Sequence, residues 1–361
     1  MFSRRIHTAE DARRLAKKRL PWMVFDYIDG AAGDEGGARR NRAALNGITL
    51  TPRILKDVSA RTLATTVLGA QAHVPFGIAP MGMCNLSAPG ADLMLARLAA
   101  RHRVPLGVST VASTPMERMI EVAEGNAWFQ LYFSGDGEGT FKLVDRARAA
   151  GYRTLILTVD VPEVARRPRE LRHGFQMPFR MGPRQIFDFA MHPRWSLATL
   201  LAGRPEMANF TMPGFDFDRT ESRAKANWDT LKDLRARWPG QLVVKGVLDP
   251  QDAKRLQEQG VDAIQLSNHG ARQLSSAPSP IDVLPAMRDT LGGSYPLFLD
   301  SGIRSGEDIL RALLTGADFV FLGRILQFAI AAGGEAGLQQ LWHGLEAELR
   351  GAMAMLGLTH L

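Results

Sequence analysis

The chain has 361 residues, of which 45% are hydrophobic and 22% are charged, the balance of an ordinary globular protein with a large core. A single cysteine, Cys84, excludes a disulfide framework and fits a reducing compartment. The formal net charge of +7 comes from scattered Lys and Arg residues, which argues against a nucleic-acid partner. An anionic membrane surface or a small acidic ligand remains compatible with this charge.

The amino-terminal residues are charged and do not form a signal peptide, and no uninterrupted apolar run reaches the length of a membrane span. We therefore expect a cytoplasmic protein. Residues 8–28 have helical character, with Thr8 as the expected N-cap and Asp11 in the first turn. Residues 29–33 break this helix, and a second helix is expected from about residue 35 to 45.

Eight short apolar runs recur along the rest of the chain. They span residues 76–80, 105–109, 128–132, 154–160, 241–245, 263–267, 296–300 and 319–323. Near-continuous apolar runs are typical of parallel strands that are buried on both faces. Helical patterns lie between most of them, for example at 92–100, 140–150, 249–259 and 306–314. This alternation predicts an α/β fold, the (β/α)₈ TIM barrel, with residues 1–361 forming a single domain.

Most of these runs end in a polar or charged residue. The residues at or just beyond the strand ends are Ser109, Tyr132, Asp160, Lys245, Ser267, Asp300 and Arg324. In barrels of this class the active site lies at the carboxyl ends of the strands, so we expect these side chains to converge there. A long gap between the fourth and fifth runs holds an insertion, residues 178–225, and long insertions are usually lids, partner surfaces or disordered segments.

The stretch after the sixth run places His269 and Arg272 at one strand end. A titratable base beside a fixed cation is suited to acid–base chemistry on an anionic substrate. A lone histidine is more often structural. Glycines and arginines follow the seventh and eighth runs, at Gly302, Arg304, Gly323 and Arg324. They predict a phosphate site, although glycines there also suit tight turns.

The sequence resembles the FMN-dependent (S)-2-hydroxy-acid dehydrogenases and oxidases over nearly its whole length. The resemblance rests on Ser-Asn-His-Gly-Ala-Arg-Gln-Leu at 267–274, Val-Lys-Gly at 244–246 and Asp-Ser-Gly-Ile-Arg at 300–304. Further matching segments are 20–27, 129–132 and 157–160. Residues 192–197 and 208–210 are most similar to the mandelate dehydrogenase branch of this family.

The resemblance implies that FMN binds at the strand ends, with its phosphate near the glycines and arginines named above. Lys245 would lie beside the N1–C2=O edge of the flavin and stabilise negative charge there. Ring contacts are implied for Ala79, Met81, Ser109, Gln130 and Thr158, and further cofactor contacts for Ser267 and Asp300. No metal site is predicted.

The resemblance also implies the catalytic roles. His269 would be the base, and Asp160 would pair with its imidazole and stabilise the charged form. Arg272 and Arg167 would hold the substrate carboxylate. The register from Asp160 favours Arg167 over the adjacent Arg166. The hydroxyls of Tyr27 and Tyr132 would contact the substrate, although aromatic packing is a common alternative role.

Three positions bear on specificity and on the support of the site. Ser275 stands where the family usually has Asp. This difference raises the question of how the loop that carries His269 is held in place. Val111 stands where glycolate oxidase has Trp, so a bulkier or aromatic 2-hydroxy acid is expected to fit. At position 82, near the flavin, the chain has Gly as in mandelate dehydrogenase and unlike glycolate oxidase. This similarity favours poor reaction of the reduced flavin with oxygen.

In the branch that this chain resembles, the insertion attaches the enzyme to the membrane. Aromatic residues and arginines are mixed in residues 178–225, which suits an anionic lipid interface on the cytoplasmic face of the inner membrane. An ordinary lid is the alternative. The expected electron acceptor is a quinone or another respiratory carrier, and the expected assembly is a homotetramer. The competing functions are an oxidase that produces hydrogen peroxide and a non-redox barrel that binds a phosphate ligand.

Overall fold

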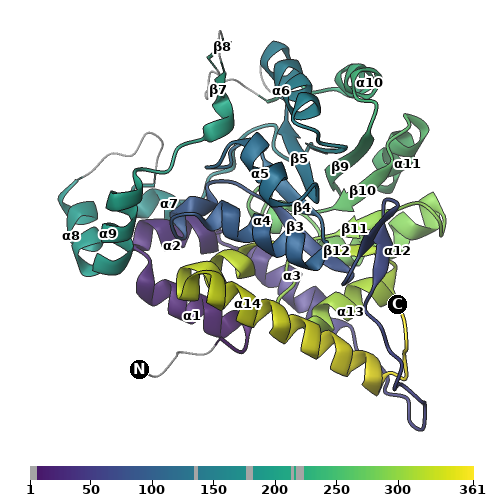
Figure 1. The fold of residues 1–361 in the computed structure, drawn as a ribbon. Coiled ribbons are helices and arrows are strands. Elements are labelled where there is room, and N and C mark those ends of the chain that lie inside the picture. The colour runs from purple at the N-terminus through teal and green to yellow at the C-terminus, as the bar shows by residue number, and fades with distance from the viewer. Residues whose placement is uncertain (1–5, 134–136, 176–181, 213–214, 217–222) are drawn as a thin grey trace.

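The computed structural model describes residues 6–133, 137–175, 182–212, 215–216 and 223–361. Its centre is a closed barrel of eight strands in the ring order β10-β11-β12-β3-β4-β5-β6-β9, in which all neighbours are parallel (Figure 1). The strands are β3 (Phe76–Met81), β4 (Leu106–Ser109), β5 (Ala127–Tyr132), β6 (Thr154–Thr158), β9 (Gln241–Val247), β10 (Ala263–Leu266), β11 (Leu297–Leu299) and β12 (Phe319–Leu322). The predicted (β/α)₈ barrel is confirmed, and each expected run supplies one barrel strand.

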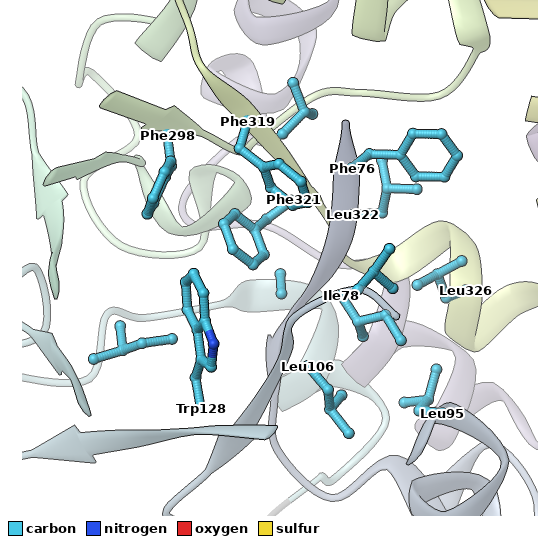
Figure 2. Packing of buried hydrophobic residues seen from close by; sticks show 14 of the residues in the cluster. Phe76, Ile78, Leu95, Leu106, Trp128, Phe298, Phe319, Phe321, Leu322 and Leu326 are labelled. Carbon is cyan, nitrogen blue, oxygen red and sulfur yellow. The ribbon is translucent and has the colours of Figure 1, made fainter. Parts of the chain in front are cut away.

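Aromatic side chains fill the interior of the barrel below the polar strand ends. Trp128 on β5 lies 5.9 Å from Phe298 on β11 and 5.6 Å from Phe321 on β12, measured between ring centroids (Figure 2). Strands β5 and β11 stand on opposite sides of the ring, so their side chains can meet only through its centre. The barrel is therefore a packed core that leaves room for a ligand only at its mouth.

Helices surround the barrel and connect its strands. They are α4 (Ala91–His102), α5 (Met116–Val122), α6 (Glu138–Ala149), α10 (Trp228–Arg237), α11 (Pro250–Glu258), α12 (Pro280–Leu291), α13 (Gly306–Thr315) and α14 (Arg324–Met355). Four of these, α4, α6, α11 and α13, correspond to the helical patterns expected from the sequence. Side-chain caps define some of the helix starts: Ser305 accepts a hydrogen bond from the backbone of Asp308, and Asp249 accepts two from the first turn of α11.

The amino-terminal segment differs from the expectation of one helix over residues 8–28. It forms α1 (Ala9–Arg19) and α2 (Trp22–Asp29), separated at Leu20 and Pro21, because a proline lacks the amide donor and disfavours helical geometry in the residue before it. Thr8 is the N-cap, as expected, and accepts a hydrogen bond from the Asp11 amide. Helix α3 (Gly36–Gly47) follows, then the hairpin β1 (Thr65–Val67) and β2 (Ala70–Ala72). Helix α1 packs against α14 (Figure 1).

The long connection between β6 and β9 carries its own short elements. They are α7 (Pro168–Arg172), α8 (Pro183–Met191), α9 (Pro193–Ala202), η2 (Ala208–Phe210), β7 (Thr211–Met212) and β8 (Phe215–Asp216). Helices α8 and α9 form a hairpin at the edge of the molecule, beside α2 and α7 (Figure 1). Part of the expected insertion, including Phe179 and Arg180, lies outside the described residues. In the described part of the chain, no helix has both the length and the apolar character needed to cross a membrane.

Candidate active site

A cavity of about 220 Å³ opens at the carboxyl ends of the strands. Fourteen of the residues predicted for the site line it: Tyr27, Ala79, Met81, Val111, Tyr132, Arg167, Lys245, His269, Arg272, Asp300, Gly302, Arg304, Gly323 and Arg324. Five predicted residues, Ser109, Gln130, Thr158, Asp160 and Ser267, do not line it. Two of these five lie behind lining residues: Asp160 contacts His269, and Ser267 contacts Lys245.

His269 and Asp160 form a hydrogen-bonded pair at this mouth. The imidazole Nδ1 lies 3.0 Å from Oδ1 and 3.3 Å from Oδ2 of Asp160, which leaves Nε2 as the ring nitrogen free of this contact. Burial lowers the pKa of His269 below the ordinary histidine value, although Asp160 opposes the shift. His269 and Lys245 hold the pKa of Asp160 below its ordinary value against the effect of burial. At neutral pH the pair therefore consists of a neutral imidazole and a carboxylate, the state required of a general base.

The backbone that presents His269 is strained. His269 has a φ of 58° and Ala271 a φ of 61°, in the left-handed region that residues with a Cβ rarely adopt. Two side chains compensate, because Ser267 Oγ accepts a hydrogen bond from the His269 amide and Asn268 Oδ1 accepts one from the Ala271 amide. The glycine between them has a φ of 63°, which costs glycine little.

Two arginines share the cavity with the histidine. The Arg272 Nη1 donates to the backbone carbonyls of Tyr27 and Gly30, both at 2.8 Å, and its Nη2 lies 3.0 Å from a carboxylate oxygen of Glu170. The Arg167 Nη1 lies 3.3 Å from the same Glu170 oxygen. Arg166 is exposed and does not line the cavity, in keeping with the expected register.

Both tyrosines predicted for the site are half-buried, and their hydroxyls are protonated at neutral pH. Burial raises the pKa of Tyr27 to about 12, and burial also raises the pKa of Tyr132. The Tyr27 ring stacks on Phe175 at 4.3 Å between centroids, and Arg223 lies over the Tyr132 ring at 4.2 Å. Both tyrosines line the cavity, and a protonated phenol there can donate or accept a hydrogen bond.

Lys245 is a buried cation at the centre of the strand ends. Its Nζ donates to Ser267 Oγ at 2.8 Å and lies 3.3 Å from Asp300 Oδ2. Burial opposes its charge, but Asp300 and Asp160 outweigh burial and raise the pKa of Lys245 above the ordinary lysine value. Ser301, which was not predicted, joins this network by donating to Asp300 Oδ1 at 2.7 Å and accepting from the Gly270 amide. The position of Ser301 in the Asp-Ser-Gly stretch was the sequence signal that could have identified it as a site residue.

Two of the predicted ring contacts have unsatisfied polar atoms. The Gln130 Nε2 and the Thr158 Oγ1 are buried without a hydrogen-bond partner among the described residues, while the Ser109 hydroxyl donates to Gln130 Oε1 at 3.1 Å. Buried polar atoms are normally hydrogen-bonded, so these two atoms, although their residues do not line the cavity, are available to a polar ligand. A flavin ring, with donors and acceptors along its pyrimidine edge, fits these two atoms.

The other end of the cavity carries cations without counterions. Among the described residues, neither Arg304 nor Arg324 forms an ion pair, and Arg324 donates to the carbonyls of Asp29, Gly30 and Gly270. Burial lowers the pKa of Arg324 to about 10 and also lowers that of Arg304. Two half-buried cations that form no ion pair among the described residues fit the phosphate of FMN.

Val111 lines the cavity beside Gly82. A Cβ added at Gly82 would overlap with the Val111 side chain, so the glycine allows this close packing. The hydroxyl of Ser275, where the family usually has Asp, donates to Asp34 Oδ1 at 3.2 Å. The support of the histidine comes from Asp160, Ser267 and Asn268 instead.

One barrel mouth thus brings together a histidine–carboxylate pair and four arginines, an arrangement typical of a barrel enzyme that binds an anionic cofactor. The family model for FMN-dependent dehydrogenases matches residues 16–361, so the chain belongs to this family and FMN is its cofactor.

Individual relatives match over almost the full chain. The chain is 38% identical to (S)-mandelate dehydrogenase of Pseudomonas putida, over 99% of this chain and 92% of that protein. It is 37% identical to L-lactate dehydrogenase of Pectobacterium atrosepticum, over 98% of this chain and 94% of the relative. The crystal structure of the monotopic membrane protein (S)-mandelate dehydrogenase superposes with a TM-score of 0.94 at 37% identity and covers 98% of this chain and 96% of that chain.

Proposed function

We propose that this enzyme oxidises an (S)-2-hydroxy acid to the 2-keto acid. The observation that carries the proposal is that the His269–Asp160 pair shares one cavity with Arg272 and Arg167. A base and a carboxylate clamp in one cavity suit a substrate whose reacting CH–OH group is adjacent to its carboxylate. The names of the matched relatives, an (S)-mandelate and an L-lactate dehydrogenase, describe this substrate class.

In the proposed reaction, Arg272 and Arg167 bind the substrate carboxylate, and Tyr27 donates a hydrogen bond to it. His269 Nε2 accepts a proton from the CH–OH group, and Asp160 stabilises the imidazolium that results. Tyr132 contacts the substrate oxygen. Bound FMN supplies the two-electron acceptor for the substrate.

The remaining residues are proposed to hold the cofactor. Arg304, Arg324 and the backbones at Gly302 and Gly323 bind the phosphate, and Lys245 faces the flavin with a positive charge. The other proposed cofactor contacts are Ala79, Met81, Ser109, Gln130, Thr158, Ser267 and Asp300.

The proposal is tested by mixing the holoenzyme anaerobically with a panel of (S)-2-hydroxy acids and following the loss of flavin absorbance. We expect (S)-mandelate or L-lactate to reduce the flavin, with bulkier substrates accommodated beside Val111. His269→Ala should retain FMN and be reduced more slowly by orders of magnitude. Reduction at the wild-type rate in this variant would refute the assignment of the base.

We further propose that the enzyme contacts a membrane peripherally, on the cytoplasmic face of the inner membrane, through the α8–α9 hairpin. This hairpin exposes several large apolar side chains, from 57% to 88% of their surface: Ile186, Phe187, Met191, Leu197, Leu200 and Leu201. Exposed Arg184 and Arg194 accompany them, and a mixture of apolar and cationic side chains suits an anionic lipid surface. A lid over the cavity is the alternative role.

Sedimentation with anionic vesicles tests the membrane contact. The full-length protein should bind the vesicles, and excision of residues 178–225 should release it with flavin reduction retained. A full-length protein that is monodisperse without detergent and ignores such vesicles would contradict the contact.

A respiratory quinone is the proposed electron acceptor, and a homotetramer is the proposed assembly. The second candidate is an oxidase that transfers electrons to oxygen. Gly82 lies beside Val111 at the cavity. Its similarity to the residue in mandelate dehydrogenase implies poor reaction with oxygen and so favours the quinone as acceptor. Hydrogen peroxide formation measured with and without a soluble quinone separates the two, because an oxidase produces stoichiometric peroxide in the absence of quinone. Light scattering gives the assembly mass.

A further inference from the structure

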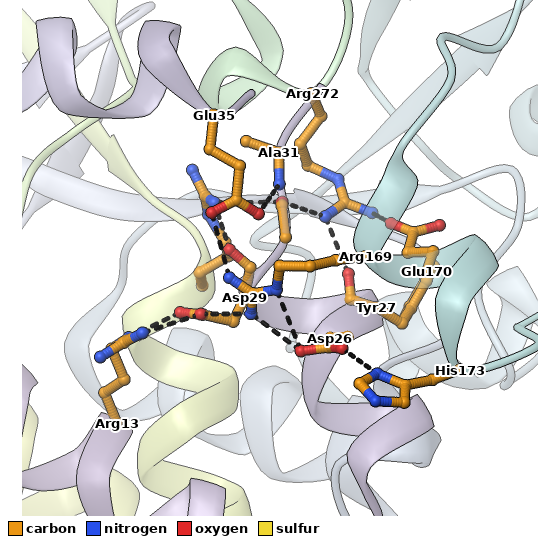
Figure 3. A network of polar contacts seen from close by, with 12 residues as sticks. Arg13, Asp26, Tyr27, Asp29, Ala31, Glu35, Arg169, Glu170, His173 and Arg272 are labelled. Atoms are coloured by element: carbon orange, nitrogen blue, oxygen red, sulfur yellow. Dashed lines mark hydrogen bonds and ion pairs between the residues drawn. The ribbon is translucent and has the colours of Figure 1, made fainter. Parts of the chain in front are cut away.

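A carboxylate of the protein already bridges the two arginines of the proposed clamp. Glu170 is buried, and its Oε1 lies 3.0 Å from Arg272 Nη2 and 3.3 Å from Arg167 Nη1 (Figure 3 shows the contact with Arg272). Burial and then the charge of Arg167 lower the pKa of Arg272, while Glu170 opposes both effects. The clamp is therefore a set of three charged groups in which Glu170 separates two cations.

The helix that carries Glu170 is fixed to the amino-terminal segment. Helix α7 has five residues, and its Arg169 contacts three carboxylates: Asp26 at 2.9 Å, Asp29 at 2.7 Å and Glu35 at 3.1 Å (Figure 3). Burial opposes the charge of Arg169, yet the pKa of Arg169 is raised above the ordinary arginine value because Asp29 and the other carboxylates outweigh burial. Such a network holds the α7 backbone in place, so Glu170 stays with the arginines when a ligand arrives.

The remaining donors of the clamp are few and fixed in direction. Arg272 gives three of its N–H groups to Tyr27, Gly30 and Glu170. The Arg167 Nε donates a hydrogen bond to the Arg272 carbonyl, and its Nη2 donates one to the Gln273 side chain. A guanidinium is planar, so fixing several of its donors fixes the direction of the rest. Glu170 is the one group that holds both guanidinium planes at once among the residues the structure describes.

We propose that Glu170 is a positioning residue for the substrate carboxylate: it holds Arg272 and Arg167 in the orientation in which their free N–H groups receive that carboxylate. This inference rests on the proposed function of the two arginines. The bound complex then has alternating charges, with Glu170 and the substrate carboxylate on either side of the cations. Glu170 itself does not touch the substrate.

Replacing Glu170 by Gln distinguishes positioning from simple electrostatics, because the two predict opposite changes in the affinity for a carboxylate ligand. Removal of a negative charge raises the positive potential at the clamp, so electrostatics alone predicts tighter binding of a carboxylate. Positioning predicts weaker binding, because a neutral amide holds two mutually repelling cations less strongly than a carboxylate does, so the arginines lose part of their shared orientation.

The experiment uses the FMN-loaded enzyme. Binding of benzoate, an unreactive carboxylate, is followed through the change in flavin absorbance, and flavin reduction by the 2-hydroxy acid is followed by anaerobic stopped flow. We expect Glu170→Gln to raise the Kd of benzoate and the KM of the substrate about tenfold or more, the loss of one charge-assisted contact, with a smaller fall in the limiting reduction rate. The matched control is Glu163→Gln, an exposed carboxylate before α7, which should leave both constants unchanged.

Unchanged or tighter benzoate binding in Glu170→Gln would overturn the inference. If this variant yields no folded holoenzyme, Glu170→Asp provides the test, since it keeps the charge but withdraws it by one methylene. That variant should bind benzoate several-fold more weakly than the wild type, and equal affinity would overturn the inference. Failure of the proposed function looks different: the wild-type flavin would then not be reduced by any 2-hydroxy acid, whatever the effect of Glu170 on benzoate.

Discussion

Replacement of Asp160 by Asn isolates the charge that faces His269. The two side chains are in contact through Nδ1, at 3.0 Å and 3.3 Å from the carboxylate oxygens. The Asn amide oxygen has nearly the same position and still accepts a hydrogen bond from Nδ1–H, so the ring orientation is kept. The substitution therefore removes the stabilisation of the imidazolium, together with the contribution that Asp160 makes to the charge of Lys245.

The size of the effect follows from this geometry. Two unit charges whose centres are about 4 Å apart interact by about 4 kcal/mol at an effective dielectric constant of about 20. At about 1.4 kcal/mol for each factor of ten, complete loss of this interaction slows the proton-transfer step about 10³-fold. Only part of the charge has developed in the transition state, so we expect flavin reduction to slow between about 10²-fold and 10³-fold.

The assay is single-turnover flavin reduction under anaerobic conditions at saturating 2-hydroxy acid, across a range of pH. The neutral imidazole is the active base, so activity is lost as the pH falls through the pKa of His269. Because Asp160 raises that pKa against the effect of burial, the Asn variant should lose activity only at lower pH than the wild type. Asp229→Asn, an exposed carboxylate on α10, is the control. A reduction rate within about threefold of the wild type, with FMN bound, would refute the electrostatic reasoning.

Three further predictions concern the cofactor, the membrane and stability. Arg304→Met should weaken FMN binding about 10-fold to 100-fold in a fluorescence titration of the apoprotein, since one charge-assisted phosphate contact is lost, and equal affinity would exclude Arg304 from the phosphate site. The double change of Leu200 and Leu201 to Glu should abolish sedimentation with anionic vesicles while flavin reduction continues, because it removes about 1.5–3 kcal/mol of apolar burial per side chain; retained sedimentation would show that the hairpin end is not the contact. Burial raises the pKa of Asp92 to about 6, above its ordinary value of 3.8, so the folded protein holds this proton more tightly than the unfolded chain. Its contribution to stability is complete below about pH 4 and is lost as the pH rises through about 6, by about 3 kcal/mol in all. Urea denaturation should show this loss in the wild type relative to Asp92→Asn, and parallel pH profiles for the two proteins would contradict it.

The barrel was predictable because its signal is local and repeated. Strands buried on both faces need near-continuous apolar runs, and eight such runs separated by helical patterns allow few other folds. Pro21 also predicts the break between α1 and α2, but the apolar periodicity on both sides of it favours one continuous helix. Helix α9 lacked a comparable signal, because none of its residues is buried and its apolar residues show little helical periodicity.

The site divides in the same way between local and distant residues. His269 and Arg272 are three residues apart and could be predicted together from one strand end. Glu170 could not be predicted, since an acidic residue in a charged stretch is usually solvated, and only the fold brings it between Arg167 and Arg272. Ser275 raised a question about the histidine loop that the geometry answers, because Asp160, which follows β6, and Ser267, two residues before His269, both support His269.

The sequence by itself determined the barrel, the family motifs and the residue types that carry the chemistry, because periodicity and short motifs depend on neighbours along the chain. Tertiary structure decided which charges face each other: Asp160 behind His269, Asp300 beside Lys245, and Glu170 between two arginines. Apart from the local contact between Arg167 and Glu170, these pairings join residues far apart in the chain, and burial sets their strength. Both are properties of the closed barrel and not of any segment of it.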